Sequence, residues 1–198
     1  LTNLGAAHYM QGDFEEAADA WRRSVEIEPS GTTYLNLGTM YYYLGRYAES
    51  VEMYQRALTY TPEYFLAWGS LGDAWSQIEG GEGEARAAYA QAIELGNALL
   101  AVNPSDVEAL GAMAAYHAHL GNMARANEFM ERAMQLAPAD YYNHYYAAIL
   151  KLAAGDSPGA MESIREAASL GLPGHILAGE PMLTPLRDKQ GFLALADE

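Results

Sequence analysis

Cysteine is absent from this sequence of 198 residues, and basic residues are few. Without cysteine, the chain has no disulfide framework, no thiolate nucleophile and no zinc–thiolate site. Lys and Arg number 11 against 26 Asp and Glu, which gives a formal net charge of −15. Because phosphate contacts need clustered Lys and Arg, this balance argues against a nucleic-acid partner. The excess acid either serves solubility alone or biases the surface toward basic or neutral partners.

Long apolar runs are missing as well. Gly, Pro, Asn and Gln interrupt the longest charge-free stretches, and none reaches the ~20 apolar residues of a membrane span. No basic and apolar leader opens the sequence, so it shows no signal peptide. We therefore expect no membrane insertion and a cytoplasmic location, with the periplasm as the alternative.

The motifs of common enzyme classes are also absent. The sequence holds no P-loop and no G-x-G-x-x-G, and its "GGEGEA" lacks the lysine and the preceding strand of a phosphate loop. No nucleophile elbow and no pair of acids suited to general acid–base catalysis stands out. We expect no enzyme activity, no catalytic residue and no cofactor in these residues.

What the sequence does contain is a repeat. A small residue, three others, a bulky residue, two others and a second small residue recur as Ala17-Trp21-Ser24, Ser50-Tyr54-Ala57, Ala85-Tyr89-Ala92, Ala126-Met130-Ala133 and Ala160-Ile164-Ala167. These anchors follow one another at spacings of 33, 35, 41 and 34 residues. Each is preceded by a helical pair, namely Leu4-Gly5, Leu37-Gly38, Leu71-Gly72, Met113-Ala114 and Ala147-Ala148.

Glycine and proline punctuate the repeat. A glycine marks the turn inside most repeats, at Gly12, Gly45, Gly121 and Gly155, and a proline closes each second helix, at Pro29, Pro62, Pro104, Pro138 and Pro173. Apolar residues three or four apart share one face of a helix. The small residue at Gly5, Gly38 or Gly72 lets two helix backbones approach, and a bulky anchor such as Trp21 or Tyr54 fills the space between them. One helix pair cannot bury its apolar face alone, so neighbouring pairs stack.

This pattern resembles the tetratricopeptide repeat, a family of helix–turn–helix units with the consensus W-x2-L-G-x2-Y…A-x3-F…P. "WGSLGDAW" (68–75) and "YLNLGTMY" (34–41) carry the closest match. The resemblance covers residues 1 to about 173. It implies an all-α, right-handed α-solenoid of about five repeats, at 1–30, 31–64, 65–106, 107–140 and 141–173. Leu1 stands where the consensus has its first aromatic, so we expect the natural chain to continue upstream.

The third repeat departs from the pattern. Its anchor Tyr89 precedes the closing proline by 15 residues, whereas Trp21, Tyr54 and Met130 precede theirs by 8. The extra seven residues make about two helical turns and nearly preserve the buried face. They predict one long helix over roughly 83–102 that steps the last two repeats away from the first three. A break at 96–97 is the alternative.

After the fifth repeat, residues 174–198 are expected to form a C-terminal cap, because terminal repeats need a polar outer face. Its buried side is predicted to hold Leu183, Leu186, Phe192, Leu193 and Leu195. The phrase "PMLTPLRDKQGFLAL" also resembles the tail that follows such repeats in bacterial signalling proteins, including receptor-like Ser/Thr kinases and nucleotide cyclases. That resemblance implies a bacterial source.

Histidine is the remaining candidate for a metal ligand. "HAH" at 117–119 looks like a pair, but residues two apart on a helix point to different sides. His8 and His117 occupy the repeat position that holds Tyr41 and Trp75 elsewhere, which indicates packing. The sequence therefore predicts no metal site.

The resemblance implies a binding groove lined by the first helix of each repeat. The groove positions carried over to this sequence that we expect to contact a partner are Asn3, Tyr9, Asn36, Tyr42, Tyr43, Ser70, Asp73, Gln77, Glu108, His119, Tyr142 and Tyr145. In some family members, asparagines at the position of Asn3 and Asn36 bond the backbone of an extended peptide, since an amide both donates and accepts. The alternative is that these asparagines serve locally or meet water.

Tyrosine is frequent at these groove positions. It offers large contact area with a polar handle, which binding surfaces favour. For Tyr145 and its neighbour Tyr146, packing near the cap is the competing interpretation. Family members that clamp the C-terminal carboxylate of cytosolic chaperones carry Lys and Arg where this chain has Thr2, Leu66 and Ser70, so that ligand is not expected.

The sequence thus predicts a protein–protein interaction scaffold that binds a partner peptide or protein segment in the groove. Two alternatives stay open. One is self-assembly into a homo-oligomer through the repeat ends, where Leu1 and Leu4 are under-covered. The other is regulation of a kinase or cyclase lying upstream in the same chain.

Overall fold

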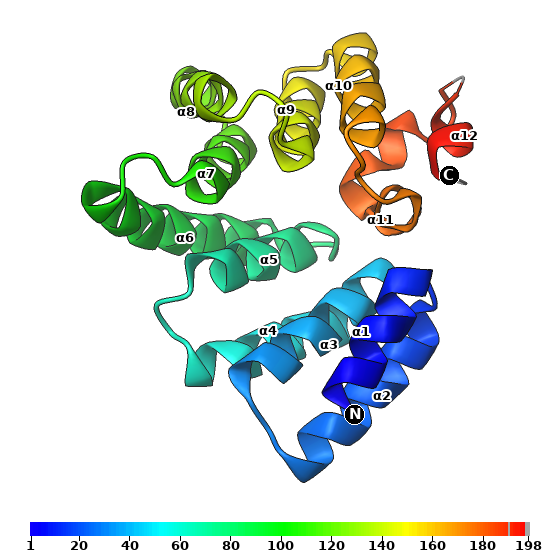
Figure 1. Ribbon diagram of the computed structural model, residues 1–198. Helices are drawn as coiled ribbons and strands as arrows, with labels where there is room; N and C mark the ends of the chain where they lie inside the picture. Colours follow the sequence, from blue (N-terminus) through cyan, green and yellow to red (C-terminus); the bar gives the residue numbers. More distant parts are fainter. Residues whose placement is uncertain (190, 197–198) are drawn as a thin grey trace. The chain divides into compact units, whose positions relative to one another are not determined.

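The computed structural model describes residues 1–189 and 191–196, and within these ranges the regular elements are helices without strands. The chain divides into two compact units, Leu1–Ala92 and Ile93–Glu198, and the division falls inside helix α6. Each unit is a stack of antiparallel helix pairs, coloured along the chain in Figure 1. The fold is therefore an all-α helical repeat, as the sequence predicts.

Unit 1 contains the first five helices and the first half of the sixth. Their bounds are α1 Thr2–Gln11, α2 Phe14–Ile27, α3 Gly31–Tyr43, α4 Tyr47–Tyr60, α5 Phe65–Ser76 and α6 Glu82–Val102. From α1 to α5, each helix packs against the next one in the chain. The predicted turn glycines Gly12 and Gly45 have φ of 78° and 73°, a conformation that residues with a Cβ rarely adopt. Ser30 begins α3 by accepting a hydrogen bond from the Thr33 amide at 3.2 Å.

The predicted close approach at the small residues is confirmed within unit 1. A Cβ placed on Gly5 would lie 2.6 Å from the Trp21 ring, and one on Gly38 would lie 2.7 Å from the Tyr54 ring. Gly72 stands in the same relation to Tyr89. The aromatic anchor of each second helix thus lies against the first helix, in the space that the missing side chain leaves.

The long helix predicted in the third repeat is also confirmed. Helix α6 runs without interruption from Glu82 to Val102, and no break occurs at 96–97. Gly96 is accommodated because the Met113 side chain lies over it, so that a Cβ would come 2.5 Å from the Met113 Sδ. A glycine in the interior of a helix normally weakens that helix. At Gly96 the missing side chain instead leaves room for Met113.

Unit 2 contains the rest of α6 and the remaining elements. These are α7 Val107–His119, α8 Met123–Leu136, α9 Tyr141–Ala153, α10 Ser157–Ser169, α11 Gly174–Gly179, the 3₁₀ helix η1 Pro181–Leu186 and α12 Phe192–Ala196. Helix α7 packs on α8 and α9, and α9 packs on α10. The tail after α10 folds back onto this stack, because η1 contacts α9 and α10, and α12 contacts α10.

The prediction of which side chains of the C-terminal cap are buried is correct in part. Leu183, Leu186 and Phe192 are buried, and Leu195 is half-buried. The prediction for Leu193 is wrong, since 65% of it is exposed. Helix α12 spans little more than one turn, and consecutive residues on a helix lie about 100° apart. With Phe192 turned into the core, Leu193 points away from it.

No helix in the described ranges is long and apolar enough to cross a membrane.

Candidate functional site

A cavity of about 290 Å³ lies on the face that α1 and α3 share in unit 1. Its walls bring together two of the predicted partner-binding residues, Tyr9 and Asn36. The remaining lining comes from Ala6, Trp21, Thr39 and Met40. The lining contains no Lys, Arg, His, Asp or Glu, so the cavity suits a neutral ligand group.

Asn36 lies at the wall of this cavity. Its side chain is half-buried at the cavity wall and makes no hydrogen bond to any described residue. Among the described residues, the Asn36 side chain therefore has no local hydrogen-bond partner within α3. Asn3, one repeat earlier, is exposed on α1 outside this cavity.

The residues after Gly38 and Gly72 accept a hydrogen bond from the hydroxyl of the packed tyrosine anchor. The Tyr54 hydroxyl donates to Thr39 Oγ1 at 3.2 Å, and the Tyr89 hydroxyl donates to Asp73 Oδ1 at 2.8 Å. Asp73 is predicted to contact a partner, and here its carboxylate orients Tyr89. In the first repeat the corresponding residue is Ala6, which has no acceptor, and the buried Trp21 Nε1 finds no hydrogen-bond partner among the described residues.

Giving Trp21 an acceptor is expected to stabilise unit 1. The substitution Ala6→Thr reproduces the Thr39 arrangement and should raise the free energy of unfolding by about 1 kcal/mol relative to Ala7→Thr, because a buried donor gains its bond. Ala7 is the exposed neighbour on α1, so the second variant carries the same helix-propensity cost. Urea unfolding followed by tryptophan fluorescence measures the difference. Equal stability of the two variants would contradict this assignment.

The tyrosines of α3 differ in their surroundings. Tyr42 is 5% exposed and belongs to a core cluster with Val51, Tyr54 and Leu71. The structure thus places Tyr42 in the core instead of on an open wall, because α4 and α5 both pack over it. Tyr43 is half-buried with its ring centroid 5.1 Å from that of Phe14.

The predicted residues of α5 lie at the surface of unit 1. Ser70 and Gln77 are both half-buried. Gln77 Nε2 donates to Ser76 Oγ at 3.1 Å, next to it in the chain. Neither residue lines the cavity of α1 and α3.

The predicted residues of unit 2 differ in their surroundings. Glu108 is exposed in the first turn of α7, and Tyr142 is exposed with its ring 4.7 Å from that of Tyr141. Burial lowers the pKa of His119 to about 4, so its imidazole is neutral at pH 7. The Tyr145 hydroxyl donates to Glu180 Oε2 at 2.9 Å, which supports the alternative that this residue packs against the cap.

Asn143 and Glu180 are buried polar residues of unit 2 that the sequence pattern did not predict. Asn143 is 1% exposed and donates from Nδ2 to the carbonyls of Ala133, at 3.2 Å, and Ala137, at 2.9 Å. Glu180 is 5% exposed and accepts from both Tyr145 and the Met182 amide. The one available signal for Asn143 was a polar residue on the apolar face of a helix, between Tyr141 and Ala147.

His117 behaves as a packing residue. The His117 ring stacks on Phe129 with centroids 5.4 Å apart and an interplanar angle of 11°. Burial also lowers the pKa of His117. The described residues contain no group of three or more His, Asp or Glu that could hold a metal ion.

Comparison with known proteins identifies the repeat. Residues 1–30 match the sequence profile of the tetratricopeptide repeat, and residues 38–77 match a second profile described as TPR repeat. A search of curated proteins found no match.

Solved structures share the fold. The chain is similar to TTC0263, a thermophilic TPR protein of Thermus thermophilus, with 20% identity, a TM-score of 0.63 and coverage of 86% of this chain and 89% of that one. It is also similar to MamA from Desulfovibrio magneticus RS-1, with 20% identity, a TM-score of 0.52 and coverage of 85% and 91%. At these identities the likeness establishes the helical-repeat solenoid class.

Proposed function

This chain is a tetratricopeptide-repeat protein, and on that premise we propose that it is an interaction scaffold whose α1–α3 face binds an extended segment of a partner protein. A scaffold role agrees with the two tetratricopeptide-repeat profiles that the chain matches. The observation that carries the finer proposal is the cavity in which Tyr9 and the unbonded amide of Asn36 meet.

The chemistry of the cavity favours a peptide backbone as the bound group. An extended peptide presents one N–H and one C=O per residue, and the Asn36 amide supplies an acceptor and donors that match both. Tyr9 adds aromatic area beside that amide, and its ring lies 6.5 Å from the ring of Trp21. Met40 and Ala6 provide an apolar wall for a small partner side chain.

The substitution Asn36→Ala is expected to weaken this binding about tenfold, which corresponds to the loss of hydrogen bonds worth about 1.4 kcal/mol. Peptides are first selected from a random displayed library on the natural protein, and their affinities are then measured by isothermal titration calorimetry. Asn97→Ala is the matched control, because Asn97 is an exposed asparagine on α6. Circular dichroism confirms that both variants are folded.

The proposal fails if the selected peptides bind Asn36→Ala and Asn97→Ala with equal affinity. It also fails if the selected peptides protect from hydrogen exchange a surface other than α1 and α3. Tyr42 is unsuitable for this test, because its removal would disturb the core.

A second candidate function, self-association, is favoured by the exposed apolar side chains of α1 and the residue before it. Leu1, Leu4 and Met10 are 43%, 48% and 65% exposed. Such residues, when clustered, mark surfaces that another chain covers. Light scattering over a concentration series distinguishes the two candidates, since a scaffold for other proteins keeps its monomer mass while a self-assembling one does not.

A further inference from the structure

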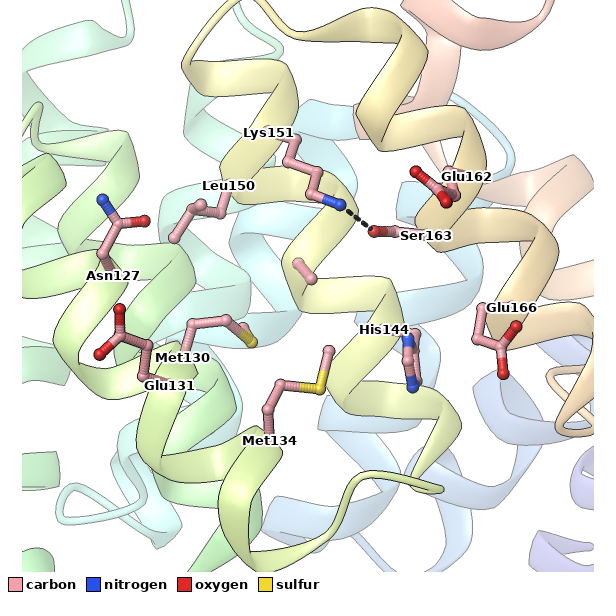
Figure 2. A pocket seen from close by; sticks show the side chains of 11 residues that line it. Asn127, Met130, Glu131, Met134, His144, Leu150, Lys151, Glu162, Ser163 and Glu166 are labelled. Atoms are coloured by element: carbon pink, nitrogen blue, oxygen red, sulfur yellow. Dashed lines mark hydrogen bonds between the residues drawn. The ribbon is translucent and has the colours of Figure 1, made fainter.

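Unit 2 contains a larger cavity, of about 500 Å³, between α8, α9 and α10. Figure 2 shows its side chains converging from these three helices. The lining residues are Asn127, Met130, Glu131, Met134, His144, Ala147, Leu150, Lys151, Glu162, Ser163 and Glu166. A volume of this size lies in the range of ligand-binding pockets.

The cavity exists because the fifth repeat has small or polar residues where the second and third repeats carry leucine and an aromatic residue. Ala147 occupies the position of Leu37, and Lys151 occupies the position of Tyr41. In unit 1, Leu37 and Tyr41 are both buried in the core cluster that includes Trp21. The space that these side chains fill in the second repeat is therefore open in the fifth.

Lys151 does not close the space that an aromatic ring would fill. Its Nζ donates to Ser163 Oγ at 2.9 Å and to the Gly159 carbonyl at 3.3 Å, so the ammonium is held against α10 (Figure 2). Met130, Met134 and Leu150 give the cavity an apolar floor. Methionine adapts its shape to different bound groups, which suits a docking surface.

The rim of the cavity carries unbalanced negative charge. In the second repeat Arg56 donates to Glu52 at 2.9 Å, and the pair neutralises itself. The fifth repeat has Glu162 and Glu166 at the same two positions, four residues apart on one helix face, where like charges repel.

Glu131 of α8 adds a third acid to this rim. None of the three acids forms an ion pair with a described residue. Figure 2 shows Glu131 on one side of the cavity and Glu162 and Glu166 on the other. A cation brought by another molecule would relieve the repulsion within α10 as well as gain its own pairing.

We propose that this cavity docks a segment of a partner protein that inserts an aromatic or long apolar side chain, flanked by Lys or Arg, between α8 and α10. The inserted side chain replaces the Leu and Tyr that the fifth repeat lacks and contacts the methionines. The flanking bases pair with Glu131, Glu162 and Glu166. This site is separate from the α1–α3 face and does not depend on the function proposed for it.

The probes are three capped peptides that differ at the central and flanking residues: Gly-Arg-Trp-Arg-Gly, Gly-Gln-Trp-Gln-Gly and Gly-Arg-Ala-Arg-Gly. Each is titrated into protein labelled with ¹³C at the methionine methyl groups, and the methyl signals are followed by nuclear magnetic resonance. The first peptide is expected to shift the Met130 and Met134 signals at concentrations about tenfold lower than either of the others. Equal shifts by all three peptides would overturn the proposal.

Two sets of variants test the cavity and its charge. Ala147→Leu restores the side chain of the second repeat and should abolish the shifts, because it occupies the space. The triple variant Glu131→Gln, Glu162→Gln, Glu166→Gln should weaken binding of the first peptide about tenfold. Its control, Glu28→Gln, Glu63→Gln, Glu94→Gln, makes the same change in net charge at exposed glutamates outside the cavity and should bind as the natural protein does.

The outcomes are decisive in both directions. The proposal is overturned if the cavity triple variant binds the first peptide with unchanged affinity, or if its control loses as much affinity. This test remains valid even if circular dichroism shows that Ala147→Leu disturbs folding. Asn36→Ala should leave these methionine shifts unchanged. Failure of one site is therefore distinguishable from failure of the other.

Discussion

Gly38→Leu is expected to lower the free energy of unfolding of unit 1 by about 3 kcal/mol, because it overpacks a filled contact. A Cβ alone would lie 2.7 Å from Tyr54 Cδ1 and 3.3 Å from the Met53 Cβ. Tyr54 cannot withdraw easily, since it is buried and its hydroxyl bonds Thr39 on the same helix as Gly38. The backbone at this point is further held by Ser50, which donates to the Gly38 carbonyl at 2.8 Å.

A double-mutant cycle tests the cause of this loss. Tyr54→Ala alone is expected to cost about 4 kcal/mol through the cavity it leaves. In the combined variant the new leucine can enter that cavity, so the total cost should stay near that of Tyr54→Ala instead of reaching the sum. Additive costs would show that the two side chains do not compete for one space.

Tryptophan fluorescence is the appropriate measurement for this cycle. Trp21, Trp68 and Trp75 are the three tryptophans of the chain, and all lie in unit 1. Urea unfolding followed by their emission therefore reports on the unit that carries Gly38 and Tyr54. Circular dichroism follows the helices of the whole chain in the same samples.

Asn143→Ala is expected to destabilise unit 2 by about 3 kcal/mol. The substitution removes two hydrogen bonds from the end of α8, each worth about 1 kcal/mol, and leaves a void at a fully buried position. The Asn143 amide is a second donor to these two carbonyls at the end of α8, because Ala133 O also accepts from the Ala137 amide and Ala137 O from the Asp140 amide. Asn143 thus ties the start of α9 to the end of α8.

Hydrogen exchange followed by mass spectrometry localises this effect. In Asn143→Ala, peptides from the end of α8 and the start of α9 should exchange faster, while peptides from α2 to α4 should not change. Asn127→Ala is the control, because Asn127 is an exposed asparagine on α8. Equal exchange in the two variants would show that the buried amide is not a structural tie.

Features that depend on residues close together in the chain were predicted from the sequence, whereas features that depend on residues far apart were not. The turn at Gly45 and the uninterrupted α6 follow from residues within a few positions of one another, and these were predicted correctly. The contact of Gly38 with Tyr54 was also predictable, because the repeat supplies the same pair at a fixed spacing in several copies.

The surroundings of the candidate site residues depend on side chains of other helices, which the pattern of a single helix does not predict. Tyr42 and Tyr43 are adjacent in the sequence, yet packing of α4 and α5 buries Tyr42 while Tyr43 keeps partial exposure. Tyr145 meets Glu180, 35 residues further along, only because the tail folds back onto the stack. No local spacing specifies such a contact.

The sequence alone therefore determined the helical repeat, its turns and its resemblance to the tetratricopeptide repeat, because these rest on local periodicity repeated many times. Only the tertiary structure decided which tyrosines are buried, where Asn143 bonds and that Ala147 and Lys151 leave a cavity between α8 and α10. The physical reason is that burial and cavities are properties of several helices at once. Each depends on the volume that residues far apart in the chain together fill or leave empty.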